Sequence, residues 1–485
     1  MKPNLQRLKR VAGPAVLAGI LVAAGSRPAR AQTQPDEPKQ TPEVQQLKER
    51  VKQLEQTVEE LKGQINSIET TQKEAATQQT TAAPVGEAIA AGAPVPVSGS
   101  APAPRQEEKK TGGTFEVYGF AMLDSGFQFK QNHPDWYDVV RPTKLPAFKN
   151  EFGSDGNTFF GVRQSRLGVR SSTPTKYGEL KTQFEFELFG TGADAGQTTF
   201  RLRHAYGELG HFGAGQTNSV FMDGDVFPNS LEYWGPNGMV FFRNLQVRWM
   251  PIKGRSRVTI ALEKPGGSAD GGNYADRIEL QGIKPTFKWP DLTGEARLGR
   301  DWGYVEVAGV VRSLRWVDRN NDNLDLGGSD IGWGLNLSSN LNFGKNDVGR
   351  FQVVYGEGIE NYMNDAPVDV GVEPNNVADP RRPVKGVALP VLGVVAFLDH
   401  TWNKRFSSTG GYSMLNIENS SGQAPSAFRR GHYALGNLLY YPTEKTMVGG
   451  EFQFGRRENH SDGWGVNDYR MQFSFKYNFS KVFEF

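Results

Sequence analysis

Apolar and polar residues alternate with a period of two from Thr114 to Phe485. The last segment shows the pattern best. Aromatic residues share one face and are interrupted only by Lys481: Phe473, Phe475, Tyr477, Phe479, Phe483 and Phe485. Such alternation predicts strands with one apolar and one polar face. A chain that ends on an aromatic residue after this pattern favours a membrane β-barrel over a soluble sandwich.

Counting these segments predicts about sixteen antiparallel strands, an even number that suits a bacterial transmembrane barrel. The expected strands lie near residues 115–129, 160–171, 179–189, 199–209, 213–221, 240–250, 256–264, 290–299, 304–316, 330–343, 349–357, 391–402, 407–418, 430–441, 446–456 and 466–485. The predicted fold class is therefore an all-β transmembrane barrel over residues 114–485, preceded by an α-helical coiled coil.

Short and long connections alternate between these strands. The short ones are 172–178, 210–212, 251–255, 300–303 and 442–445, and the long ones are 130–159, 222–239, 265–289 and 358–390. Short turns of bacterial barrels face the periplasm and long loops face outwards. This orientation leaves the segment that precedes the barrel in the periplasm.

Residues 1–31 have the features of a secretory signal peptide, with basic residues, an apolar run from Val11 to Gly25 and the cleavage site Ala29-Arg30-Ala31. They hold six of the 55 Lys and Arg residues and no acid, so the mature chain carries 49 basic against 53 acidic residues. This nearly balanced charge gives no reason to expect nucleic acid as a partner.

Residues 43–71 predict a coiled coil behind a short lead at 32–42. Apolar residues recur there at alternating steps of three and four: Val44, Leu47, Val51, Leu54, Val58, Leu61, Ile65 and Ile68. The heptad predicts self-association; its β-branched residues lean towards a dimer but leave the oligomer number open. Residues 72–113, rich in Ala, Pro and Thr, predict a disordered linker.

The sequence carries no signal for a disulfide, a further membrane helix or a catalytic site. The chain has no cysteine, and after the signal segment it has no apolar run long enough for a membrane helix. His204 and the pair Asp399-His400 have no serine placed beside them by a recognisable motif, so no catalytic site is expected. We expect neither a cofactor nor a bound metal.

Three motifs resemble those of bacterial trimeric porins: the run from Arg163 to Val169, the run from Leu202 to Leu209, and Gly215-Gln216-Thr217. The stretch from Phe221 to Met239 narrows the resemblance to the DcaP-like porins, which carry a periplasmic coil before the barrel. This resemblance covers nearly the whole mature chain. It implies a sixteen-stranded trimer in outer-membrane lipid that passes small anionic solutes, with dicarboxylates as the type substrates.

Alternation assigns the faces of the strands. It places Leu167, Val169, Leu202 and Tyr206 towards lipid, and it places a set of basic residues in the lumen as candidates for anion binding. These are Arg166, Arg170, Lys181, Arg201, Arg203, Arg248, Arg297, Arg312 and Arg350. The register at Arg312 is ambiguous because residues 305–316 are apolar on both faces. Arginine suits such a path because it stays charged and binds carboxylates through two donors.

The resemblance also implies that the loop at 222–238 folds into the pore. Asp223, Asp225 and Glu232 would then face the arginines across a constriction; alternatively, these acids only brace the loop. The net charge of the lumen is also undecided, since Glu185, Glu187 and Glu451 could neutralise the arginines. A different class of function also fits the sequence, in which the chain is a structural envelope tether and the barrel is its anchor.

Overall fold

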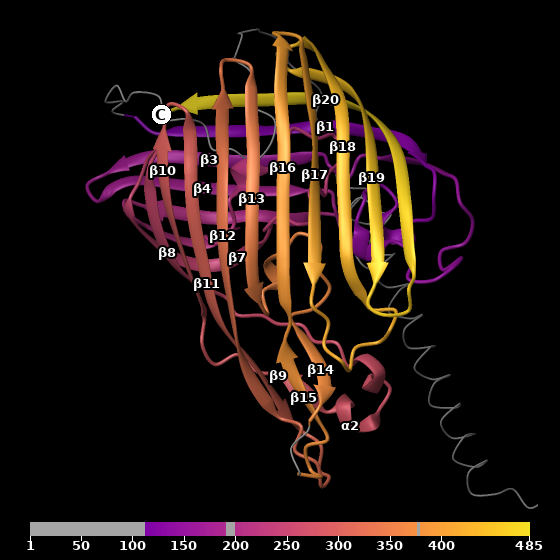
Figure 1. Ribbon diagram of the computed structural model, residues 1–485. Coiled ribbons are helices and arrows are strands. Elements are labelled where there is room, and N and C mark those ends of the chain that lie inside the picture. Colours follow the sequence, from indigo (N-terminus) through magenta and orange to yellow (C-terminus); the bar gives the residue numbers. More distant parts are fainter. Residues whose placement is uncertain (1–111, 191–198, 376–378) are drawn as a thin grey trace, which may run out of the picture. The chain divides into compact units, whose positions relative to one another are not determined.

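The computed structural model describes residues 112–190, 199–375 and 379–485, and in these residues sixteen antiparallel strands close into one barrel (Figure 1). The expected signal peptide, lead, coiled coil and all but the end of the linker lie outside the described residues. No helix in the described part of the chain is long and apolar enough to cross a membrane.

The barrel strands follow one another around the wall in chain order. They are β1 (Thr114–Gln128), β3 (Arg166–Thr175), β4 (Gly178–Glu187), β5 (Arg201–Leu209), β6 (Phe212–Asn218), β7 (Arg243–Ile252), β8 (Arg257–Glu263), β10 (Asp291–Arg300), β11 (Gly303–Asp318), β12 (Gly328–Phe343), β13 (Asp347–Glu357), β16 (Pro390–Asn403), β17 (Phe406–Ile417), β18 (Phe428–Thr443), β19 (Thr446–Asn459) and β20 (Gly465–Glu484).

Pairing of the first strand with the last closes the barrel. β1 pairs with β20 from Thr114 opposite Glu484 to Gln128 opposite Arg470, and with β3 on its other side. Closure leaves no sheet edge exposed, which the interior of a bilayer requires.

The connections confirm the predicted two-ended arrangement. β3 and β4, β5 and β6, β10 and β11, and β18 and β19 are joined by short turns at one end, where β1 begins and β20 finishes. The loops at the other end are long, and several carry small elements of their own: β2 (Asn157–Gly161), β9 (Ile283–Pro285), α2 (Ile278–Gln281), β14 (Val370–Pro374) and β15 (Val384–Ala388). We call the end with the long loops the outer end and the other the periplasmic end.

The sequence prediction missed these small elements and fused two strands. The strand expected at 160–171 corresponds to β2 and β3, which are separated by residues 162–165. β2 continues the sheet beside β1 where β3 stops, with Asp124 opposite Gly161. Segments of three to five residues are too short for a period-two pattern to define them.

A β-bulge in β5 corrects one predicted side chain. His204 pairs with Glu185 but Leu202 already pairs with Phe186, so Arg203 is the extra residue. The bulge shifts the parity of the remaining residues of β5, and Tyr206, expected towards lipid, lies on the inner face beneath the guanidinium of Arg248, 5.0 Å from its ring centre.

The long loops fold back onto one part of the inner wall. Inward-facing apolar residues of β11, β13, β16, β17 and β18 pack against loop residues that include Phe221, Met239 and Tyr362. This packing explains why residues 305–316 are apolar on both faces. Val307 and Val311 face outwards, whereas Ala308 and Val310 face a loop-filled interior.

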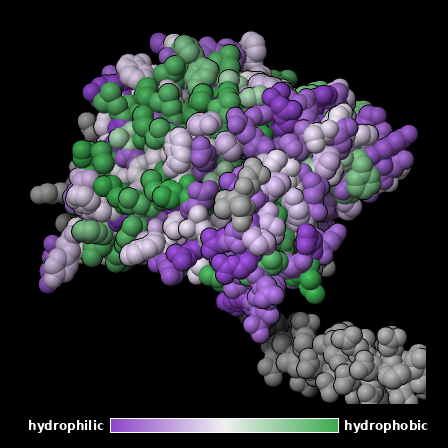
Figure 2. All heavy atoms as spheres, turned by 60° about the horizontal axis from the view of Figure 1, so that its bottom comes forward, coloured by the Kyte–Doolittle hydropathy of each residue, from purple (hydrophilic) through white to green (hydrophobic). Residues whose placement is uncertain are grey.

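The outer surface of the barrel is apolar. Exposed positions alternate with buried ones along the strands, as at Leu335 and Leu337 of β12, which are 58% and 52% exposed. Figure 2 shows hydrophobic side chains gathered on the barrel wall at the left and hydrophilic ones over the outer loops below. This distribution is typical of a wall that faces lipid and of loops that face water.

We predict that Gly411→Ala destabilises the barrel, because the ring of buried Phe397 lies across the Gly411 backbone where a Cβ would stand. Overpacking of this kind costs ~1–3 kcal/mol and lowers the unfolding midpoint by a few degrees. The midpoint is measured as the temperature at which the compact form disappears on detergent gels. Gly436→Ala is the control, since nothing lies within 4 Å of its added Cβ; equal midpoints for the two variants would contradict the prediction.

Candidate functional site

The connection between β6 and β7, residues 219–242, lies inside the barrel, and we call it the constriction segment. Successive residues hydrogen-bond to successive parts of the inner wall. Ser219 binds Glu263 of β8 at 2.9 Å, the carbonyl of Asn229 accepts from Asn437 of β18 at 2.9 Å, and the amide of Leu231 donates to β19 at 2.7 Å. The segment therefore follows the wall around the lumen.

Two acids of the constriction segment hold it to the wall at β10–β12. The carboxylate of Asp223 is fully buried and lies 2.6 Å from Arg297 Nη2, and it accepts hydrogen bonds from Tyr304 and Ser338, each at 2.6 Å. Asp225 meets the same guanidinium at 2.5 Å. Both acids thus brace the segment against β10 through a direct ion pair.

Glu232 anchors the segment on the far side. Its buried carboxylate accepts backbone hydrogen bonds from Trp234 at 3.0 Å and Gly235 at 2.6 Å, and a third bond from the hydroxyl of Tyr433 at 3.0 Å. Burial raises the pKa of Glu232 to about 7, against the opposing effect of the backbone donors. This acid binds backbone and hydroxyl donors, whereas Asp223 binds an arginine.

Three of the predicted lumenal arginines meet two glutamates on β3–β5. Arg203 lies 2.6 Å from both Glu185 and Glu187, and Arg201 Nε lies 2.8 Å from Glu187. Arg166 lies further away, at 3.6 Å from Glu185 and 3.5 Å from Glu187. Both glutamates are buried, while the side chains of Arg166 and Arg201 are 20% and 28% exposed.

The sequence did not reveal a fourth arginine at this place. Arg243 begins β7, and its charge interacts with those of Arg203 and Glu187. Counting from lipid-facing Leu245 places Arg243 on the lipid side, but it turns inwards at the start of the strand, with its guanidinium 5.0 Å from the Phe241 ring. The parity rule holds within a regular strand and loosens at its ends.

We call Arg166, Arg201, Arg203 and Arg243 the arginine cluster. It carries two positive charges more than Glu185 and Glu187 neutralise. Within the described residues, Nε and Nη2 of Arg243 are buried without a hydrogen-bond partner. Buried donors are normally paired, so these two stand out as cationic groups that lack a partner among the described residues.

The constriction segment reaches the arginine cluster through Tyr233. The Tyr233 hydroxyl hydrogen-bonds to Glu187 and Arg201 and lies 3.3 Å from Arg203 Nη1. Its ring stacks on Phe189 with centroids 4.1 Å apart. The cluster therefore lies at the level of the constriction.

Two other candidates lie near the periplasmic end, each beside an acid. Arg170 meets Glu116 at 2.6 Å, and Lys181 meets Glu179 at 2.8 Å. Both basic side chains are well exposed, at 43% and 51%. Screening by water and salt keeps such exposed pairs weak.

The remaining candidates are tied to the wall or the loops. Arg350 pairs with Asp399 at 2.6 Å, and Arg312 pairs with Asp369 at 2.9 Å. Arg248 has neutral partners, the side chain of Gln246 at 3.0 Å and a backbone carbonyl at 2.7 Å. The predicted arginines are therefore spread over several paired sites, and the arginine cluster stands out by its surplus charge.

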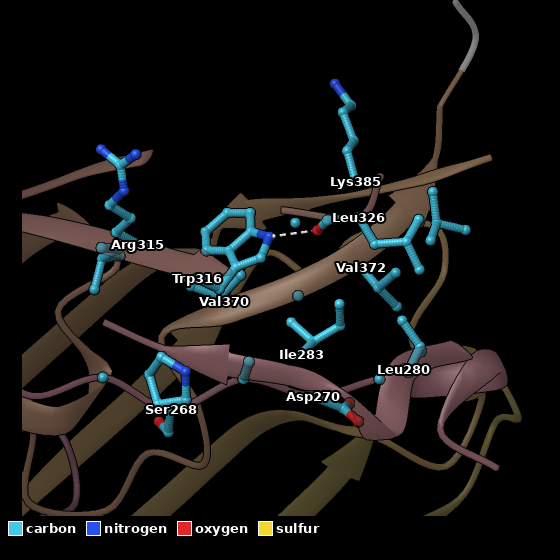
Figure 3. Close-up of a pocket in the computed structure, with 18 of the residues that line it drawn as sticks. Ser268, Asp270, Leu280, Ile283, Arg315, Trp316, Leu326, Val370, Val372 and Lys385 are labelled. Carbon is cyan, nitrogen blue, oxygen red and sulfur yellow. Dashed lines mark hydrogen bonds between the residues drawn. The ribbon is translucent and has the colours of Figure 1, made fainter. Parts of the chain in front are cut away.

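A cavity of about 310 Å³ lies in the outer loops, beside β9, β14 and β15 (Figure 3). Its lining is apolar and includes Trp316, Leu326, Leu280, Ile283, Val370 and Val372. Figure 3 shows the charged ends of Arg315 and Lys385 extending away from these side chains. The cavity therefore lacks the cationic lining that distinguishes the arginine cluster.

Comparison with known proteins agrees with this geometry. The barrel superposes on the outer-membrane channel DcaP of Acinetobacter baumannii with a TM-score of 0.62 and 19% identity, covering 77% of this chain and 99% of the other. An anion-selective porin from Comamonas acidovorans gives a TM-score of 0.50 and 9% identity, with coverage of 76% and 100%. These identities show the fold alone. No curated protein matches the sequence.

Residues 117–479 match the family described as DcaP outer membrane protein. The match spans the barrel from β1 to β20, including the constriction segment and the arginine cluster. The closed wall of sixteen strands, its apolar outer face and the inward-folded segment are those of a channel. The chain therefore belongs to the DcaP outer membrane protein family, and it is an outer-membrane porin.

Proposed function

We propose that this porin passes small anionic solutes, dicarboxylates among them, along the arginine cluster. The observation that carries the proposal is the surplus of two positive charges in that cluster, with buried donors of Arg243 left unpaired beside the constriction segment. Several guanidinium groups side by side offer a carboxylate two parallel donors, and a second carboxylate of the same solute a further cation.

The loops support this route. They cover the apolar inner wall of β11, β13 and β16–β18, so the polar wall of β3–β7 is left for a hydrated solute. A cation held at a low-dielectric wall exerts a stronger field than one in bulk water. Selectivity then depends on this one wall, although the mature chain is slightly acidic.

An anion must be released by the arginine cluster as well as bound by it. Glu185 and Glu187 each bind two or more of the arginines and lower the net charge that an anion meets. A path of moderate positive charge attracts an anion without trapping it, which conduction requires.

Export and assembly complete the proposal. The segment 1–31 directs secretion, residues 43–71 form a periplasmic coiled coil, and the barrel assembles as a homotrimer in outer-membrane lipid. The regular heptad supports self-association, and three copies are what the resemblance to the trimeric porins implies. Charge selectivity needs no cofactor or catalytic group.

We predict that Arg201→Gln combined with Arg243→Gln lowers the permeability ratio of anions over cations several-fold, because it removes the surplus charge and leaves Arg203 bound to both glutamates. The measurement is the reversal potential of the purified porin in a planar bilayer under a salt gradient. The effect should shrink at high salt, where the screening length falls to ~3 Å.

Arg170→Gln combined with Lys181→Gln is the matched control, because it removes the same charge from exposed pairs near the periplasmic end. An unmodified channel that prefers cations, or a cluster variant with unaltered selectivity at low salt, would refute the anion proposal. Absence of conductance would instead favour a structural envelope tether.

We predict that Asp223→Asn combined with Asp225→Asn raises single-channel conductance and current noise, because Arg297 loses the ion pairs that hold the constriction segment to β10. Arg297 keeps its ion pair with Glu306 at 2.5 Å, so the double variant releases the constriction segment while the buried guanidinium stays paired on the wall. Conductance is compared at equal salt with Asp322→Asn, an exposed loop variant. Identical current traces for the two would show that the wall holds the segment without these acids.

We predict that deleting residues 32–113 leaves single-channel conductance unchanged and weakens the oligomer, because the linker separates the expected coil from the pore wall. The oligomer is measured by native mass spectrometry and conductance by bilayer recording. Loss of conductance in a folded, inserted barrel would mean that the deleted segment is part of the pore.

A further inference from the structure

A group of charged residues faces outwards on β18 and β19, where the barrel surface is otherwise apolar. Arg430 and His432 of β18 lie opposite Glu458 and Arg456 of β19. The parity of the strands is clear: outward Leu438 and Phe452 are 53% and 45% exposed. We call Arg430, His432, Arg456 and Glu458 the outward basic patch; its strands lie side by side between β17 and β20 (Figure 1).

The patch is fixed in place by neutral neighbours. Arg430 Nε binds the side-chain oxygen of Asn416 on β17 at 2.9 Å, and Arg456 Nη1 binds that of Asn467 on β20 at 2.8 Å. The hydroxyl of Tyr412 lies 2.5 Å from Nδ1 of His432. The two guanidinium groups are therefore oriented before any ligand arrives, which reduces the entropy lost on binding.

The patch has more positive than negative charge. Glu458 is its one acid, and it lies 2.8 Å from Arg456 but 3.9 Å from Arg430. Both arginine side chains remain 36% exposed on the outside of the wall. Two guanidinium groups thus share one carboxylate and keep donors directed outwards.

The position along the strands places the patch at the outer membrane surface. Eight positions separate His432 from Tyr440 on β18, and eight separate Arg456 from Val448 on β19. At a rise of ~3.3 Å per residue and a tilt of ~40°, this distance spans roughly 20 Å of the ~25 Å apolar band. Tyr440 lies three residues before the periplasmic end of β18, close to the inner limit of the band, so the patch lies near its outer limit.

We infer that the outward basic patch binds the phosphate groups of an anionic lipid headgroup in the outer leaflet, such as phosphorylated lipid A. Charged residues cost ~2–4 kcal/mol at the bilayer centre and almost nothing near the interface, where a phosphate is available as a partner. The arginine fork matches phosphate geometry through two parallel donors. The site is on the outside of the barrel, so it is independent of solute passage through the pore.

The inference is tested by native mass spectrometry of the full-length porin in detergent, titrated with bisphosphorylated lipid A and, separately, with dephosphorylated lipid A. We expect Arg430→Gln combined with Arg456→Gln to weaken binding of the phosphorylated lipid about tenfold or more, because two charge-assisted contacts are lost. The dephosphorylated lipid should bind the unmodified porin as weakly as the phosphorylated lipid binds the variant.

The matched control is Lys404→Gln combined with Arg405→Gln, which removes the same charge from an exposed turn at the periplasmic end of β16 and β17. It should bind the phosphorylated lipid like the unmodified porin. Equal binding by the patch variant, or equal loss in the control, would overturn the inference. So would displacement of the lipid by millimolar inorganic phosphate, which indicates a soluble-anion site, or dissociation of the oligomer in the patch variant, which indicates a subunit contact.

Discussion

Closure of the barrel between β1 and β20 is the constraint on which the rest of the structure depends. Fifteen consecutive residue pairs, from Thr114 with Glu484 to Gln128 with Arg470, fix the register in which the wall closes. Once the register is set, each side chain of a regular strand faces either lipid or lumen. Every charge in the wall then has to find a partner on the side to which it is assigned.

The arginines of the lumen differ in how many acidic partners they find. Arg297 meets Asp223 and Asp225, so its charge is used to hold the constriction segment in place. Arg312 and Arg350 are likewise bound to acids. In the arginine cluster the acids are too few, and the unpaired donors of Arg243 remain. In the proposed function, arginines of the same wall therefore serve either structure or solute, and the number of nearby carboxylates decides which.

The sequence predicted the regular part of this architecture well. Period-two alternation is imposed by the two-sided wall, so the number of strands, the two kinds of connection and the inward direction of Arg201 and Arg203 were all readable. The same rule failed where a strand departs from regularity. The bulge at Arg203 turned Tyr206 inwards, and the start of β7 brought Arg243 into the lumen.

The alternation of apolar and polar residues could not predict the contacts of the loops, for a different reason. Which arginine Asp223 meets depends on the path of the constriction segment through space, and the two residues are far apart in the sequence. The apolar inner residues of β11 gave the one available signal. Their double-sided apolar pattern left the register ambiguous. The structure shows that the inward-facing apolar residues pack against the loops.

Charged residues on the outside of the wall also need partners, but the partners there differ from those in the lumen. Inside, the proposed function leaves a surplus arginine to the solute, and outside, at Arg430 and Arg456, Glu458 supplies one carboxylate and the membrane surface is the source of any further anion. Charges at the bilayer centre are costly, so the position of these two arginines along the wall indicates that they lie at the membrane surface. Position relative to lipid, as much as residue type, thus separates an arginine proposed to attract solute from one inferred to bind a lipid headgroup.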